Sequence, residues 1–100
     1  SAVPLQIMEK CAEGIALAGQ YAAKGSVLAV SDAGCAAVLC KAALQAASLN
    51  VFINTKLMAD RTRAAALDAR ADALLAEFVP QADEVFSTVS GKLRNKYHHK

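Results

Sequence analysis

The sequence predicts an all-α fold, an antiparallel helical bundle of three to four helices in which one helix is long and almost fully apolar. Apolar residues make up 55% of the chain, and many of them are alanine, the strongest helix former. Only two prolines and five glycines interrupt the 100 residues. Apolar side chains also recur at the three- and four-residue spacing that places them on one face of a helix. These observations together favour long, uninterrupted helices.

The first helix is predicted from about Pro4 to Lys24. Proline is tolerated in the first turn, where its missing N–H costs nothing, and Gly25 suits the left-handed residue that ends a helix. Gly14 and Gly19 each weaken a helix by about 0.8–1 kcal/mol relative to alanine, which predicts close backbone contact at both positions. Two adjacent apolar stripes predict neighbours on two sides. The stripes are Leu5, Met8, Ala12, Ile15, Gly19 and Ala22, and Ile7, Cys11, Gly14, Ala18 and Tyr21.

The second helix is predicted to begin after a short connector, Gly25 to Val30, and to run to about Met58. Either Ser31 or Asp32 can cap its first turn by accepting a hydrogen bond from a free amide. At about 1.5 Å per residue the helix is roughly 40 Å long, so a bend or break is expected. Small residues over most of its circumference predict tight helix–helix contact: Ala33, Gly34, Ala36, Ala37, Ala42, Ala43, Ala46 and Ala47.

The third helix is predicted from about Asp60 to Val79, with its apolar residues on one face and its charges elsewhere. Pro80 is expected to end or kink it, and a last helix then runs to about Arg94. Residues 1–94 are thus one helical domain segment, and residues 95–100 are a polar, frayed tail. The apolar positions of the two helices are Leu67, Ala71, Leu74, Leu75 and Phe78, and Val85, Phe86, Val89 and Leu93.

The apolar second helix has more surface to bury than a chain of this length covers with its own residues. Something outside the chain is therefore expected to cover it. The candidates are a second copy in a homodimer, the commonest symmetric assembly, or a missing N-terminal half of the same protein. The chain begins at Ser1 without an initiator methionine, which indicates processing or truncation.

Charge and composition exclude several classes of partner. Eleven basic and nine acidic residues are spread along the chain without a basic patch, so a nucleic-acid partner is not expected. The longest charge-free stretch, Ala42 to Thr55, contains three polar amides and is shorter than the roughly 18 apolar residues of a membrane span, so no membrane is expected. No secretory signal is visible, and a cytoplasmic protein is expected.

Metal and disulfide chemistry are not predicted either. Cys11, Cys35 and Cys40 are odd in number and lack metal-ligand spacing, so they are interpreted as buried free thiols in a reducing compartment. His98 and His99 are adjacent and do not share a helix face, which favours a solvated tail over a metal site.

Polar residues of the second helix are the candidate functional residues, since the sequence has no hydrolase triad, phosphate loop or metal motif. Asn50 and Asn54 are four residues apart and share one face. A buried amide without partners costs about 1–3 kcal/mol, so they form an interhelical hydrogen bond, slightly favoured by the residues alone, or a polar wall facing a ligand. Asp32 is a helix cap by default, or else an acid acting on a substrate. Lys41 is interpreted as solvated.

Two motifs resemble one enzyme family. Ser31-Asp32-Ala33-Gly34, followed by Ala46-Ala47-Ser48-Leu49-Asn50-Val51-Phe52-Ile53-Asn54, look like the C-terminal half of the formiminotetrahydrofolate cyclodeaminase family. The same domain occurs alone in bacteria as a methenyltetrahydrofolate cyclohydrolase-like protein. The resemblance covers roughly Val3 to Leu75, in order and with matching spacing.

The resemblance implies a dimeric, all-helical domain that acts on a tetrahydrofolate derivative and needs no metal. The cyclodeaminase releases ammonia as 5-formiminotetrahydrofolate closes to 5,10-methenyltetrahydrofolate, whereas the cyclohydrolase opens the methenyl bridge with water. Both reactions require proton transfer at nitrogen. By this resemblance Asp32 is the catalytic candidate, as a proton relay or pterin anchor. Ser31, Asn50 and Asn54 are the substrate-binding candidates.

The family's proline- and glycine-rich N-terminal half has no counterpart in this sequence. The chain is therefore expected to be a fragment of a larger protein or a truncated relative, and to be inactive in isolation. The alternative function is a non-catalytic helical segment for dimerisation or interaction, which keeps the family's core without its site.

Overall fold

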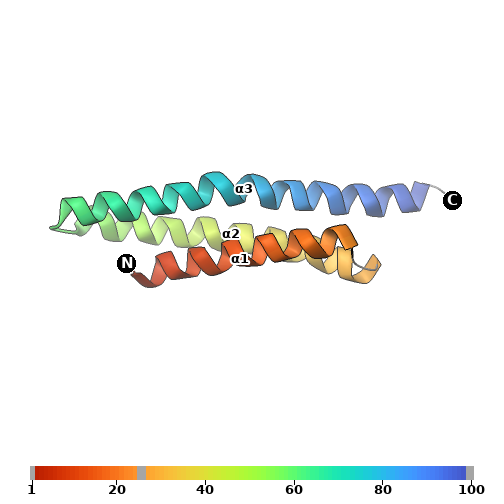
Figure 1. Ribbon diagram of the computed structural model, residues 1–100, viewed down its shortest axis with the longest axis horizontal. Coiled ribbons are helices and arrows are strands. Elements are labelled where there is room, and N and C mark those ends of the chain that lie inside the picture. The colour runs from red at the N-terminus through yellow and green to blue at the C-terminus, as the bar shows by residue number, and fades with distance from the viewer. Residues whose placement is uncertain (1, 25–26, 99–100) are drawn as a thin grey trace.

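In the part of the chain that the structure describes, three helices lie side by side (Figure 1). The computed structural model describes residues 2–24 and 27–98, with the side chains of residues 3–23 and 29–94. Helix α1 spans Ala2–Lys24, α2 spans Val27–Leu57 and α3 spans Arg61–His98. No strand occurs among the described residues, so the predicted all-α bundle is confirmed. The radius of gyration, 16.2 Å, exceeds the ~13 Å of a compact chain of this length, so much helix surface faces outward.

Helix α1 packs antiparallel to α2 and parallel to α3 (Figure 1). Its first predicted stripe forms part of the core, in which Ile15 is fully buried. The close approach predicted at Gly14 is confirmed, because a Cβ there would lie 2.8 Å from Cys40 Sγ on α2. At Gly19 a Cβ would lie 3.5 Å from Val85 Cγ2, which is ordinary contact. Of these two glycines, only Gly14 lies where an added Cβ would force a neighbouring side chain to move.

Helix α3 holds the C-terminal end of α1. Lys92 Nζ donates a hydrogen bond to Ala22 O at 2.6 Å and lies 3.4 Å from Ala23 O. Carbonyls of the last turn have no donor within their own helix, and a cation there also interacts favourably with the helix dipole. Gly25, which was predicted to end this helix, lies outside the described residues.

Helix α2 begins at Val27, four residues before the predicted cap. The predicted connector, Gly25 to Val30, is therefore wrong from Val27 onward. Val30 is buried in the core, which favours a continuous helix over a connector at this position. Ser31 and Asp32 consequently lie in the second turn, and neither is an N-cap residue. The helix continues to Leu57 without a break.

Helix α3 runs through Pro80 to His98, so the predicted division into two helices is wrong. Asp60 caps its first turn, where Oδ1 accepts a hydrogen bond from Arg63 N at 3.0 Å. Pro80 removes one backbone hydrogen bond, but Pro80 and Ala76, whose carbonyl is left free, are both exposed to water. The predicted frayed tail is also helical as far as His98, and residues 99–100 lie outside the described part.

Polar contacts fix the turn between α2 and α3. Thr55 is 2% exposed, and its Oγ1 donates to Asp68 Oδ1 at 2.6 Å. Arg61 Nη1 donates to the carbonyl oxygens of Thr55 and Met58 at 2.8 and 2.9 Å, which satisfies the C-terminal end of α2. These contacts hold the C-terminal end of α2 against the start of α3.

Two ion pairs join the helices further along the bundle. Lys41 Nζ lies 2.6 Å from Asp83 Oδ1, so the interpretation of Lys41 as merely solvated is wrong. Arg70 on α3 lies 3.4 Å from Glu9 Oε2 on α1. Both pairs are at least partly exposed, and pairs of this kind contribute about 0.2–1 kcal/mol each.

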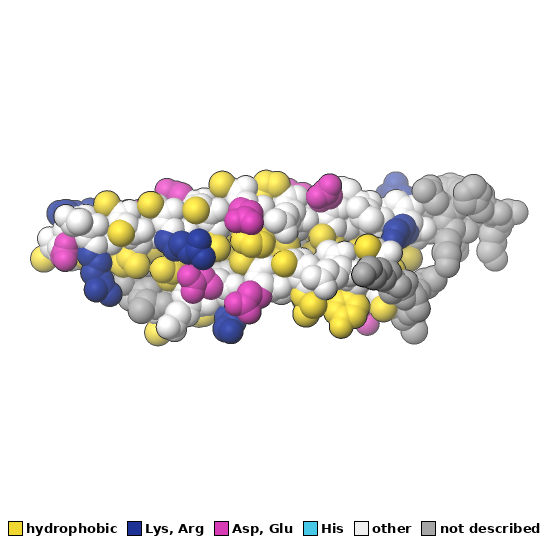
Figure 2. Space-filling view, in the orientation of Figure 1, with side chains coloured by type: hydrophobic (Ala, Val, Ile, Leu, Met, Phe, Trp, Pro, Cys, Tyr) yellow, Lys and Arg dark blue, Asp and Glu magenta, His cyan; other side chains and the backbone are white. Residues whose placement is uncertain are grey.

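The outward face of α2 remains uncovered within this chain, as the sequence predicts. Leu39, Leu49 and Ile53 are 69%, 64% and 58% exposed. Figure 2 shows how apolar side chains reach the surface along the bundle. By length and composition alone, residues 29–57 could also cross a membrane. Core helices of soluble proteins pass the same test, so this is weak evidence, and the absence of a membrane partner stays a prediction.

Candidate functional site

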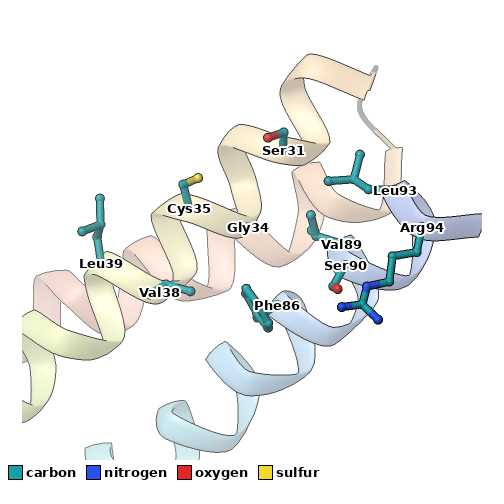
Figure 3. A pocket seen from close by; sticks show the side chains of 10 residues that line it. All are labelled: Ser31, Gly34, Cys35, Val38, Leu39, Phe86, Val89, Ser90, Leu93 and Arg94. Carbon is teal, nitrogen blue, oxygen red and sulfur yellow. The ribbon is translucent and has the colours of Figure 1, made fainter. Parts of the chain in front are cut away.

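A groove of about 640 Å³ lies between the first turns of α2 and the last turns of α3 (Figure 3). Gly34 allows the two helices to approach at its base. A Cβ at this position would lie 2.8 Å from Val89 Cγ1 and 3.1 Å from Val89 Cβ. The groove is lined by Ser31, Gly34, Cys35, Val38 and Leu39 on α2, and by Phe86, Val89, Ser90, Leu93 and Arg94 on α3.

The groove is apolar over most of its lining and carries few polar groups. Ser31 contributes a hydroxyl from α2, and Ser90 and Arg94 lie next to each other on α3 (Figure 3). Phe86 is 52% exposed and supplies an aromatic ring. An apolar groove with two hydroxyls and a guanidinium suits a flat, partly aromatic molecule that bears a carboxylate.

Asp32 stands beside this groove but does not line it. Ser31 is the only one of the four predicted site residues that contributes to the lining. Asp32 projects about 100° further round α2 and is exposed to solvent. It makes no hydrogen bond or ion pair with the described residues. The capping role is wrong, so the carboxylate remains available to a ligand or a partner.

Asn50 and Asn54 lie far from Asp32 in a single chain. They follow it by 18 and 22 residues on the same helix, which places them roughly 27 and 33 Å away along the axis. Neither amide has a hydrogen-bond partner among the described residues, so the interhelical hydrogen bond favoured from the residues is not observed. Thr55 and Asp68 make such a bond instead. One chain therefore does not bring the predicted site residues together.

Sequence reasoning missed Ser90 and Arg94. Their spacing of four residues places both on one face of α3, which is the only signal that the sequence carries. That signal has meaning only once α3 is known to continue through Pro80 and to pack beside the start of α2. The sequence instead predicts Arg94 at the end of a short last helix, before a frayed tail.

The three cysteines are free, as predicted, but they are not equally buried. Cys35 is exposed and lines the groove, which corrects the expectation that all three are buried. Burial, and then the neighbouring Cys40, raises the pKa of the Cys11 thiol above its ordinary value. Within the described ranges, no group of three His, Cys, Asp or Glu side chains could hold a metal ion.

Fold and groove together define a class, a helical domain with an apolar binding groove and a free carboxylate at its edge. Comparison with known proteins gives the family. The formiminotransferase-cyclodeaminase family model matches residues 1–73, which is most of the chain. The chain therefore belongs to the formiminotransferase-cyclodeaminase family, as the two sequence motifs indicated.

One curated relative is similar over nearly the whole chain. It is a methenyltetrahydrofolate cyclohydrolase from Methylorubrum extorquens, 37% identical over 91 residues. The aligned part is 91% of this chain but only 44% of the relative, so the chain spans less than half of that protein's length. No solved structure matches the chain.

Proposed function

We propose that the chain is part of a folate-dependent one-carbon enzyme that hydrolyses the methenyl bridge of 5,10-methenyltetrahydrofolate. The observation that carries the proposal is the 37% identity to a methenyltetrahydrofolate cyclohydrolase over 91% of the chain. The groove supports it, because an apolar wall with an aromatic ring and a guanidinium has the chemistry that a folate requires. The substrate is a tetrahydrofolate derivative, and the proposed mechanism uses no metal.

Hydrolysis of the bridge requires a base and then an acid. The oxygen of a water molecule forms a bond to the methenyl carbon, and one carbon–nitrogen bond breaks. Asp32 accepts the proton that the water loses and returns it to the departing nitrogen. The remaining hydroxyl proton is released to solvent as the C=O bond of the formyl group forms. Its exposed position next to the groove leaves it free for both transfers. General acid–base catalysis of this kind contributes about 10²–10⁴-fold to a rate.

Binding is assigned to the groove and to the two amides of α2. Ser31 donates a hydrogen bond to the pterin, and Phe86 packs against an aromatic ring of the substrate. Arg94 pairs with the carboxylates of the glutamate tail, for which a planar guanidinium is well suited. Asn50 and Asn54 bind substrate only if a second chain brings them to the groove, because they lie too far away in their own chain.

Cyclodeaminase activity is the second candidate. The family that matches residues 1–73 is described as formiminotransferase-cyclodeaminase, which favours release of ammonia from a formimino group. The same residues would serve, with Asp32 transferring a proton to the departing ammonia. A non-catalytic interaction segment is the alternative, favoured by the uncovered face of α2. We propose that either a second copy or another segment of the same protein covers that face.

The test uses a full-length family protein that carries these residues. Loss of methenyltetrahydrofolate absorbance measures the hydrolase, and ammonia released from 5-formiminotetrahydrofolate measures the deaminase. We expect the first activity, with Arg94→Ala raising KM more than it lowers kcat. Ammonia release alone would establish the cyclodeaminase. A folded protein with neither activity would leave the interaction segment as the function.

A further inference from the structure

One line of exposed residues runs along the outward face of α2. Its members are spaced alternately by three and four residues, the heptad spacing with which one helix packs on another in a coiled coil. All of them are exposed in the single chain. This line, here called the α2 seam, consists of Asp32, Cys35, Leu39, Ala42, Ala46, Leu49, Ile53 and Lys56.

Followed from either end towards Leu44, the α2 seam begins with a charged residue, continues with two apolar residues and reaches an alanine. Ala42 and Ala46 are equally distant from this centre, and so are Leu39 and Leu49. The next pair, Cys35 with Ile53, is apolar. The outermost pair, Asp32 with Lys56, has opposite charges. A seam with this pattern is complementary to a copy of itself turned end to end.

We propose that a second copy of this chain packs antiparallel on the α2 seam, in the register that places Asp32 level with the partner's Lys56. Alanines at the centre let the two helices approach closely, and the leucine layers on either side become buried. The charges of Asp32 and Lys56 favour the antiparallel over the parallel direction. In a parallel pair the like charges of Asp32, and those of Lys56, would face each other, whereas the antiparallel pair places opposite charges together at both ends.

The symmetry of the seam also identifies the occupant. A two-fold axis requires that a surface be complementary to itself, and the α2 seam meets that requirement at all of its layers. Any other segment of the protein could cover an apolar face without such symmetry. A second copy is therefore the occupant that accounts for the order of the residues as well as for their exposure.

This pairing also gathers the predicted site, a step that rests on the proposed function. Eighteen residues make five helical turns, so Asn50 lies on the same side of α2 as Asp32. In the proposed register the partner's Asn54 comes level with Gly34. The partner's Asn54 and Asp32 are then about 3 Å apart along the helix axis, compared with roughly 33 Å within one chain. Each site would contain residues of both copies.

Disulfide trapping tests the register directly. An Ile53→Cys variant of this chain places a new thiol level with the partner's Cys35, while residues 35 and 53 of one chain are roughly 27 Å apart and cannot join. We expect mild oxidation to give a covalent dimer that thiols reduce. Adding Cys35→Ser should abolish it.

A matched control uses Leu49→Cys. Leu49 lies on the same seam as Ile53 and is similarly exposed, but it is four residues, roughly 6 Å, out of register with the partner's Cys35. We expect this variant to cross-link far more slowly. Equal trapping of both variants would overturn the proposed register. Rapid cross-linking of the unmodified chain through Cys35 would indicate parallel pairing and would overturn it too, as would a chain that stays monomeric in sedimentation equilibrium at micromolar concentration.

Charge reversal provides a second test that leaves the apolar layers intact. Asp32→Lys alone, or Lys56→Asp alone, creates like charges at both ends of the dimer and should weaken association roughly 10-fold at low salt. The double variant restores opposite charges and should recover most of the affinity, with circular dichroism confirming that each variant is helical. A double variant no better than the single ones would contradict the proposed pairing.

The outcomes separate the pairing from the folate function, because none of these assays contains a substrate. If the chain fails to pair while turnover still depends on Asp32, the pairing is wrong and the proposed function stands. If the chain pairs as described while Asp32 is dispensable for turnover, the pairing stands and the catalytic assignment is wrong.

Discussion

Replacing Gly34 with alanine tests whether the close approach of α2 to α3 forms the base of the groove. The added Cβ would lie 2.8 Å from Val89 Cγ1 and 3.1 Å from Val89 Cβ. Val89 is 4% exposed and β-branched, so its side chain has little freedom to move away. The two helices must therefore separate slightly, which changes the groove as well as the packing.

The magnitude follows from two opposing effects. Overpacking in a well-packed interior costs about 1–3 kcal/mol. Alanine in place of glycine inside a helix returns about 0.8–1 kcal/mol. We therefore expect Gly34→Ala to lower the free energy of unfolding by about 1 kcal/mol. Urea denaturation followed by circular dichroism measures this difference, provided that protein concentration is held constant.

Gly91→Ala is the matched control, because Gly91 also lies inside a helix but a Cβ there meets no atom within 4 Å. This variant should raise the free energy of unfolding by up to about 1 kcal/mol, the helix propensity effect alone. The two substitutions are thus expected to differ in sign. Equal stabilisation by both would show that α2 and α3 are not in close contact at Gly34.

Three further predictions concern the helices and the thiols. Pro80→Ala should raise the free energy of unfolding by up to about 3 kcal/mol, since Pro80 lies in an exposed helix interior; a loss of stability in urea denaturation would contradict the continuous α3. Thr55→Val should lower it by about 1–3 kcal/mol, because Asp68 loses its buried donor; an unchanged midpoint would show that this contact is unimportant. In dilute protein at neutral pH, Cys11 should be alkylated more slowly than exposed Cys35. The difference in rate should narrow as the pH rises towards the raised pKa of Cys11. Equal alkylation rates, measured by mass spectrometry, would show that Cys11 is not buried.

The fold class was predictable because helical periodicity is a local property of the sequence. The stripe that contains Met8 and Ile15 is buried as predicted, and so is the face of α3 that contains Leu74. Helix ends were less predictable. Val27 to Val30 resemble a connector in composition, yet they are helical, because the burial of Val30 in the core outweighs the weaker helix propensity of valine.

The predicted break at Pro80 is wrong for a related reason. A proline removes a single hydrogen bond, and that loss is small when the freed carbonyl faces water and the residues on both sides pack against the same neighbours. Ala82 and Val85, which follow it, are buried in the same core as Leu74, which precedes it. Burial on both sides of Pro80 therefore keeps α3 continuous.

The candidate site was predictable only in part. Ser31 lines the groove, and Asp32 lies beside it, as residues of one motif should. The groove's other wall could not be predicted, because Ser90 and Arg94 reach it only through the antiparallel packing of α3 on α2. The distance between Asp32 and Asn54 follows from the helix itself, but its significance depends on what covers the α2 seam.

Turnover by an Asp32→Asn variant of a full-length family protein that carries these residues is the most direct test of the proposed function. Because Asp32 is exposed, caps no helix and contacts no described residue of its own chain, the substitution should cost no more than an exposed ion pair to the partner's Lys56, about 0.2–1 kcal/mol. Assayed at protein concentrations well above any dissociation constant for pairing, it should lower the rate of methenyltetrahydrofolate hydrolysis by about 10²–10⁴-fold. A variant that unfolds like the wild type and also turns over like the wild type would contradict the assignment of Asp32 as the acid–base catalyst.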